Sequence, residues 1–190
     1  FYQIDIISSL VTDKTKDKVL EVGVGAGIAS NYLKMAYFSG FTCDFDKDLN
    51  PDYVADVRQI PVDSGSFKVV TAFEVLEHLP FEDFEKSLRE LKRVSSKNVV
   101  ISLPYRSTVF EFIFKFPGIR SVLKKNFLSF IFRIPLKFGG IKTSGQHYWE
   151  IDSYKYSLRK ISKILKNNFK SIKKIRPVLD SYRLFFILEK

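Results

Sequence analysis

Residues 19–27 read Val-Leu-Glu-Val-Gly-Val-Gly-Ala-Gly, and this stretch decides the fold class. The apolar run from Lys18 to Val22, interrupted by one glutamate, predicts a short buried strand. Three glycines at alternate positions then form a turn, and a helix is expected over Ile28 to Phe38. A glycine-rich turn between a strand and a helix lets the backbone approach a ligand closely, because no side chain blocks it. The stretch therefore predicts a nucleotide-like ligand at the end of the first strand.

The rest of the chain alternates in the same way between short β-branched runs and helical stretches. This alternation is typical of βαβ units around a parallel sheet. Six further strands are expected at 41–45, 53–56, 67–73, 98–103, 169–175 and 183–188. Apolar stripes with helical spacing are expected at 81–94 and 154–165, and an irregular segment precedes the second stripe. The pattern therefore predicts an α/β fold with seven strands.

The glycine spacing separates two classes of nucleotide-like ligand. A dinucleotide fingerprint needs a third glycine at position 28, where this chain has Ile28. Glu21 stands two residues before Gly23, at the end of the first strand, where its charge would repel a pyrophosphate. A cofactor with a cationic centre and an ammonium group suits that carboxylate better.

Four motifs in order carry a resemblance to a known family: residues 19–27, Asp44, the stretch 55–61 and the stretch 73–80. The chain resembles the class I S-adenosylmethionine-dependent methyltransferases over about residues 15–103, and residues 73–80 resemble their type 11 branch. The resemblance implies one Rossmann-like domain, residues 1–190, with helices on both faces of a seven-stranded sheet. It also implies the strand order 3-2-1-4-5-7-6, with the last strand antiparallel, and S-adenosyl-L-methionine as the cofactor.

The resemblance also assigns residues to the cofactor. It places Asp44 on the ribose hydroxyls, with Asp46 as a close competitor, Asp56 beside the adenine amino group and Val57 under the ring. An alternative for aspartates near strand ends is a turn or helix cap, which we favour for Asp46, Asp48 and Asp52. The full expected set is Glu21, Gly23, Gly25, Gly27, Asp44, Asp46, Asp56, Val57, Phe73 and Glu74.

Methyl transfer from a sulfonium is an in-line displacement, so the protein has to align an acceptor and take up any released proton. His147 and His78 are the candidate catalytic residues, and Tyr105 and Glu74 are further candidates for a general base. The alternatives are that His78 orients a helix and that His147 only bonds backbone while Trp149 anchors the segment. Two histidines far apart in sequence and one cysteine predict no metal site, and Cys43 reads as a buried strand residue.

The net charge of +10 is distributed unevenly. Residues 1–100 hold 12 Lys and Arg against 16 Asp and Glu, whereas residues 101–190 hold 19 against 5. Within the second part, residues 105–150 form a basic, phenylalanine-rich insertion, expected as a cap or lid after the fifth strand. Three interpretations stay open for it: a lid whose phenylalanines pack on the sheet, a membrane-contacting surface, and a nucleic-acid surface.

The acceptor is expected to be a small molecule, a lipid-linked compound or a biosynthetic intermediate, as in the branch that the chain resembles. Nucleic acid is the weaker alternative, because the Asn/Asp-Pro-Pro-aromatic motif of base-amino methyltransferases is absent after the fourth strand. A non-catalytic partner subunit is a further alternative. The sequence predicts a cytoplasmic protein. Under the membrane interpretation, residues 109–142 make a peripheral contact at the inner membrane face.

Three departures from the family pattern accompany these expectations. Lys68 stands where the family usually has aspartate, in a position that is normally structural. The segments between the second and fourth strands are short, with little room for two helices. The chain begins at Phe1 without a methionine, so residues upstream are expected.

Overall fold

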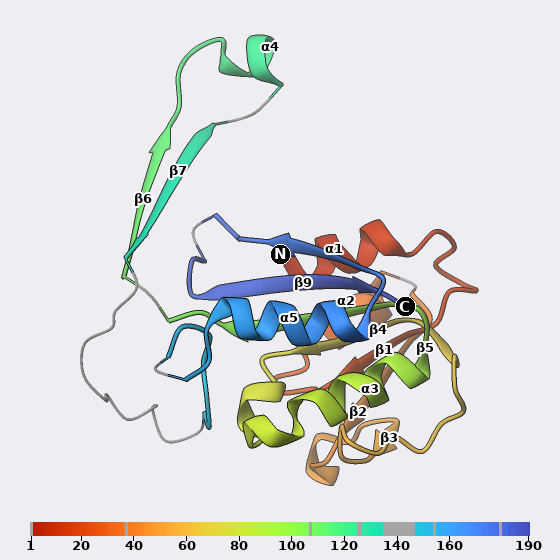
Figure 1. Cartoon of the computed structure of the whole chain (residues 1–190). Coiled ribbons are helices and arrows are strands. Elements are labelled where there is room, and N and C mark those ends of the chain that lie inside the picture. The colour runs from red at the N-terminus through yellow and green to blue at the C-terminus, as the bar shows by residue number, and fades with distance from the viewer. Residues whose placement is uncertain are drawn as a thin grey trace.

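A computed structural model describes residues 2–36, 38–106, 108–124, 127–134, 147–153, 155–178 and 180–190 of the chain. Its main feature is a seven-stranded sheet with the order β3-β2-β1-β4-β5-β9-β8. The strands β1 to β5 run parallel, and β9 runs antiparallel to both β5 and β8 (Figure 1). Counted along this sheet, the order is the predicted 3-2-1-4-5-7-6, so the predicted fold class is confirmed.

The elements lie close to the predicted ranges, with ends that differ by a few residues. The helices are α1 (Tyr2–Leu10), α2 (Ile28–Met35), α3 (Phe84–Val94), α4 (Ile119–Leu123) and α5 (Leu158–Asn168). Short 3-10 helices are η1 (Lys47–Leu49), η2 (Leu76–His78) and η3 (Phe81–Asp83). The strands are β1 (Val19–Val22), β2 (Gly40–Asp44), β3 (Tyr53–Val54), β4 (Phe67–Phe73), β5 (Ser95–Pro104), β6 (Thr108–Phe114), β7 (Leu128–Ile134), β8 (Ser171–Ile175) and β9 (Arg183–Glu189).

Helices cover both faces of the main sheet. On one face, Leu88 and Leu91 of α3 and Ile161 of α5 pack against strand residues such as Val70. On the other, α1 and α2 supply Ile7 and Leu33 to a second cluster. Because both faces are covered, β1 and β4 are buried nearly throughout, and their sequences are mainly apolar rather than alternating, with Glu21 and Lys68 as the charged exceptions.

The part between β2 and β4 is short, as predicted. It holds η1, the two-residue strand β3 and a loop, with no α-helix in residues 45–66. Lys68, the departure from the family pattern in β4, bonds Asp17 at 2.6 Å and the Thr12 hydroxyl at 2.7 Å. Its ammonium therefore fastens the loop before β1 to the sheet, which is a structural role.

The expectation of irregular structure after β5 is wrong for residues 108–114, 119–123 and 128–134. β6 and β7 form a separate two-stranded antiparallel sheet, with α4 between them, that extends away from the main sheet (Figure 1). Phenylalanines at every second position, Phe110, Phe112 and Phe114, then Phe130 and Phe132, are a strand pattern that the basic and aromatic composition obscured.

Candidate cofactor and acceptor site

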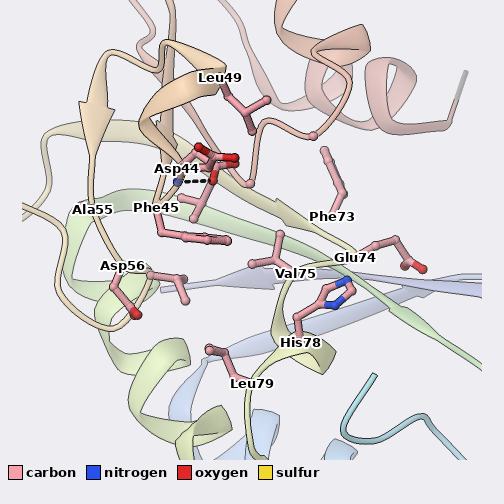
Figure 2. Close-up of a pocket in the computed structure, with 15 residues that line it drawn as sticks. Asp44, Phe45, Leu49, Ala55, Asp56, Phe73, Glu74, Val75, His78 and Leu79 are labelled. Atoms are coloured by element: carbon pink, nitrogen blue, oxygen red, sulfur yellow. Dashed lines mark hydrogen bonds between the residues drawn. The ribbon is translucent and has the colours of Figure 1, made fainter. Parts of the chain in front are cut away.

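The candidate site is a cavity of about 530 Å³ at the carboxyl ends of β1, β2 and β4. In an open parallel sheet, ligands bind at this edge where the connections that follow two neighbouring strands turn away from each other. The strand order places such a point next to β1. The cavity is lined by Val22, Gly23, Gly25, Asp44, Phe45, Asp46, Leu49, Ala55, Asp56, Val57, Phe73, Glu74, Val75, His78 and Leu79 (Figure 2). Eight of the ten expected cofactor residues are among them; Glu21 and Gly27 are not.

The three glycines of the loop after β1 all have positive φ, and each for a distinct purpose. A Cβ on Gly23, at φ 83°, would lie 2.3 Å from a methyl carbon of Val75, so this position also needs the missing side chain for space. A Cβ on Gly25, at φ 50°, would meet nothing within 4 Å, because it would project into open space beside the cavity. Gly27, at φ 70°, is the N-cap of α2.

Asp44 joins the glycine loop to the end of β2. Its Oδ2 accepts a hydrogen bond from the Val24 amide at 2.7 Å. Its Oδ1 accepts one from the Asp46 amide at 3.0 Å (Figure 2). The carboxylate is 6% exposed and faces the cavity, and each oxygen keeps a second lone pair for a ligand hydroxyl. Asp46 also lines the cavity, but it caps η1 by accepting from the Asp48 amide at 2.9 Å, as the turn interpretation expected.

Phe45 is a cavity residue that the sequence reasoning missed. Its side chain is 81% exposed although it is large and apolar, and it stands between Asp44 and Asp46 at the cavity wall. An exposed aromatic face beside a hydrogen-bonding carboxylate is the surface on which a nucleobase stacks. Its position directly after the expected ribose acid was the available signal.

Asp56 lines the cavity, with its carboxylate held by Arg58. The Arg58 guanidinium bonds both oxygens of Asp56, at 2.8 and 2.6 Å, and Asp83 at 2.7 Å. These bonds to Arg58 hold the pKa of Asp56 below its usual range. The next residue, Val57, is 7% exposed and contributes an apolar surface to the cavity. The sequence reasoning did not foresee that Arg58 would tie Asp56, on one side of the cavity, to Asp83 of η3.

Glu21 is in β1 but does not line the cavity. Its side chain is 5% exposed, and its Oε2 has no hydrogen-bond partner. Burial raises the pKa of Glu21 to about 7, against the opposing effect of hydrogen bonds from Ser30 of α2. The carboxyl group therefore lies behind the glycine loop, between β1 and α2, rather than at its ligand side.

The opposite wall of the cavity comes from the end of β4. Phe73 is largely buried, and Glu74 follows it with a φ of 53°, which non-glycine residues rarely adopt. Ser102 of β5 fixes this turn: its hydroxyl donates to Glu74 Oε1 at 2.8 Å and accepts from the Glu74 amide at 3.1 Å. Burial raises the pKa of Glu74. The strained backbone aims the residues that follow β4 at the cavity.

The two histidines meet next to this wall, although 69 positions separate them in the sequence. The imidazole of His78 lies 4.9 Å from that of His147, centroid to centroid, in an edge-to-face arrangement. His147 Nδ1 lies 3.0 Å from Glu150 Oε1, which also accepts the Tyr182 hydroxyl at 3.0 Å. His147 thus bonds a buried carboxylate rather than backbone. Trp149 is fully buried and donates to the Leu79 carbonyl at 3.1 Å, so the predicted core anchor is present.

Glu77 completes this group and was not foreseen as a site residue. It is fully buried, and neither of its carboxylate oxygens has a hydrogen-bond partner. Burial and the neighbouring Glu74 raise the pKa of Glu77 to about 8. The prediction of no metal site rested on the separation of the two histidines in the sequence, but the fold brings ligand atoms of Glu77, His78 and His147 within 4.8 Å of one another. Sequence separation gave no hint of this, since it is the fold that joins residue 147 to η2.

Comparison with known proteins indicates which class of protein has this fold. The order of the sheet and the cavity at its edge define the Rossmann-like fold of methyltransferases. The fold is similar to that of the magnesium protoporphyrin IX methyltransferase of Synechocystis PCC 6803, with a TM-score of 0.57, 18% identity, and coverage of 100% of this chain and 82% of that one. It is also similar to a SAM-dependent methyltransferase of Archaeoglobus fulgidus, with a TM-score of 0.63, 12% identity, and coverage of 100% and 92%.

A small RNA methyltransferase shares the fold as well, with a TM-score of 0.62 and 14% identity; this chain matches over its whole length and spans 25% of that protein. No curated protein matches the sequence. The model of the methyltransferase domain family matches residues 20–103, which hold the four motifs apart from Val19. Over these residues the chain is similar to the methyltransferase domain family, as the motifs predicted.

Proposed function

We propose that this chain transfers a methyl group from S-adenosylmethionine to a small-molecule or lipid-linked acceptor. The observation that carries the proposal is the cavity in which Asp44, Phe45 and the glycine loop surround one space at the edge of the sheet. Open space at Gly25, where a Cβ would meet nothing within 4 Å, supplies room for a ligand against the backbone. The similar structure of the Synechocystis enzyme was determined with bound S-adenosylhomocysteine.

The residues of the cavity fit the parts of this cofactor. Asp44 has lone pairs for the two ribose hydroxyls, Phe45 and Val57 provide apolar surfaces for the adenine ring, and Asp56 can accept from its amino group. When bound, the cofactor supplies a methyl group that is already activated by the sulfonium. The protein then has to hold the acceptor in line with that methyl group and keep water away.

On the acceptor side, His147 and His78 are the candidates for accepting a proton. Glu150 accepts from His147 Nδ1 and so leaves Nε2 as the nitrogen that can take a proton. The hydroxyl of Tyr182, the residue before β9, donates to Glu150 and fixes its carboxylate. His78 lines the cavity directly, whereas His147 reaches it through its contact with the His78 ring.

The hairpin formed by β6 and β7 favours an acceptor that is lipid-like. One of its faces carries Phe110, Phe112, Phe114, Phe130 and Phe132, because Phe110 pairs with Phe132 and Phe112 with Phe130 across the strands. Each of these rings is between 43% and 61% exposed, and none belongs to the core beneath the main sheet. A lid whose phenylalanines pack on the sheet is therefore not what the described residues of the hairpin form.

The tip of the hairpin adds positive charge to this apolar face. Lys115, Arg120 and Lys124 are exposed there, next to Phe116 and Leu123. Aromatic and aliphatic side chains that enter a bilayer interface, with Lys and Arg at the anionic headgroups, are the features of a peripheral membrane contact. No helix in the described part of the chain is long and apolar enough to span a bilayer. We propose that the hairpin brings the protein to its acceptor at a membrane surface.

The transfer itself is tested with methyl-labelled S-adenosylmethionine and three acceptor pools: a lipid extract, an aqueous metabolite extract and total RNA. The proposal expects label in the lipid or metabolite pool, and less than a tenth of it after Asp44→Asn. Asp63→Asn is the matched control, because Asp63 is exposed and outside the cavity. Label confined to RNA would establish the nucleic-acid alternative, and cofactor binding without label in any pool would establish the non-catalytic one.

A further inference from the structure

Three side chains with ligand atoms for a metal ion gather at one edge of the cavity. Glu77 and His78 are consecutive residues of η2, and His147 approaches from the segment that precedes the last helix. A backbone hydrogen bond from the Tyr148 amide to the Glu77 carbonyl, at 2.8 Å, fixes the two segments against each other. The carboxylate oxygen and the two imidazole nitrogens all lie within 4.8 Å of one another.

Glu77 supplies an independent observation that points to a missing partner. Its side chain is fully buried, and both carboxylate oxygens lack a hydrogen bond from any described residue. A buried carboxyl group whose oxygens have no partner is costly in either protonation state, and buried carboxylates in proteins are paired or bind metals. A cation bound by Glu77 and the two histidines would supply that partner.

His147 already has the orientation of a metal ligand. Its Nδ1 faces Glu150 Oε1 at 3.0 Å, and Glu150 is held by the Tyr182 hydroxyl. Histidines that bind metals usually donate their other ring N–H to a carboxylate in this way, which fixes the ring and raises the basicity of the ligating nitrogen. The carboxylate of Glu150, 5% exposed, therefore leaves Nε2 of His147 for the cluster.

We propose that Glu77, His78 and His147 bind a divalent cation of the first transition row, such as Zn²⁺ or Mn²⁺. One carboxylate and two imidazoles suit these ions, whereas Mg²⁺ and Ca²⁺ prefer sites made of oxygens only. Metal–ligand bonds of about 2.0 to 2.2 Å place adjacent ligand atoms about 3 Å apart. The ligand atoms of the three side chains, now within 4.8 Å of one another, therefore have to approach by less than about 2 Å when they bind the ion.

The position of the site suggests a role for the cation in binding the acceptor, and this role rests on the proposed function. His78 lines the cavity, so coordination positions that the protein leaves open face the acceptor side. An oxygen atom of the acceptor, from a hydroxyl or a carboxylate, can bind there and be held next to the cofactor. The imidazole nitrogens are then ligands, and a nitrogen that binds the cation does not act as the general base.

The test uses the whole chain without an affinity tag, freed of metal with EDTA and titrated with Zn²⁺. The chain has two histidines, and both are in the proposed site, so imidazole resonances in ¹H–¹⁵N spectra report on it without background. We expect both histidines to shift in a titration that saturates at one Zn²⁺ per chain. Glu77→Gln should weaken binding at least tenfold, and Glu150→Gln, which changes the partner of His147 Nδ1 but none of the three ligands, should weaken it by roughly ten- to a hundredfold.

The control is Glu82→Gln, which removes an exposed carboxylate five residues further along and should leave the affinity within twofold. Thermal unfolding of each variant shows whether it is folded. Absence of saturable binding of both Zn²⁺ and Mn²⁺, or unchanged binding by folded Glu77→Gln, overturns the proposal. Calorimetry with S-adenosylhomocysteine on the metal-free protein separates the two claims: cofactor binding without metal binding refutes the cation site alone, and metal binding without cofactor binding refutes the proposed function alone.

Discussion

Gly23 and Gly25 adopt positive φ for different physical reasons, and the difference can be measured. At Gly23 a methyl group would collide with Val75, whereas at Gly25, which lines the cavity, it would meet nothing within 4 Å. The alternate glycines of the motif therefore do not have one shared role. The first lets the end of β4 pack against the loop, and the second keeps the loop open to a ligand.

Gly23→Ala should lower the free energy of unfolding by roughly 3 kcal/mol, of which about 1 to 2 comes from the left-handed backbone and the rest from overlap with Val75. Gly65→Ala is the matched control, because Gly65 has a φ of 74° and its added Cβ meets its nearest neighbour at an ordinary 3.8 Å. It should lose about 1 to 2 kcal/mol. Urea unfolding of both variants checks the difference, and equal losses would show that the contact with Val75 is unimportant.

Glu21 should make stability depend on pH. Its pKa is about 7 in the folded chain, above the 4.5 of an exposed glutamate, so the unfolded chain loses this proton first. Stability from this group is fully present below pH 4.5 and is lost as the pH rises through 7, by an amount on the order of 3 kcal/mol. In Glu21→Gln, which has no such proton, the decrease between pH 4.5 and 8 should be smaller by that amount. An identical pH dependence in the two proteins, measured by urea unfolding, would contradict this assignment.

At the scale of elements, the hairpin of β6 and β7 stands out because its phenylalanines do not pack into either hydrophobic core cluster. Its phenylalanine face is exposed, and pairs such as Phe112 with Phe132, 6.1 Å apart between ring centroids, lie edge to face across the strands. An aromatic face of this extent is costly in water, so a surface that covers it is expected. The proposed membrane contact supplies that surface.

Phe130→Glu should abolish flotation of the protein with vesicles that contain anionic lipid, because it places a charge in the centre of the aromatic face. Ser129→Glu adds the same charge one residue earlier, on the opposite face that it shares with Ile113, and should keep binding within about twofold. Neither change touches the main sheet, so both variants should unfold at the temperature of the unchanged protein. Equal flotation of the two variants would exclude the phenylalanine face as the contact.

The elements of the main sheet were predictable because their signals are local. Strand β4 has the predicted ends, Phe67 and Phe73, since it is a mainly apolar run between turn residues. The hairpin was missed because its alternation lies within a composition that was interpreted as irregular. Glu77 and Phe45 were missed for another reason: burial without a hydrogen-bond partner and exposure of an aromatic ring are properties of the folded chain. For Phe45, the sequence offered one signal, its position directly after Asp44.

For the whole molecule, the division of charge follows the division of the fold. The half with an excess of acidic residues contains the cavity, where a cationic cofactor is proposed to bind, and the basic half contains the hairpin and the last helix and strands. The cluster of Glu77, His78 and His147 lies where the two halves meet, since one histidine comes from each. A cofactor, a cation and an acceptor would then converge on this boundary.

Isothermal titration calorimetry with S-adenosylmethionine and S-adenosylhomocysteine tests the central claim most directly. The account predicts one site per chain for either compound, binding at least tenfold weaker in Asp44→Asn, where one carboxylate oxygen is replaced, and unchanged binding in Asp63→Asn. No heat of binding with either compound on the folded protein, or the same affinity in Asp44→Asn as in the unchanged chain, would contradict it.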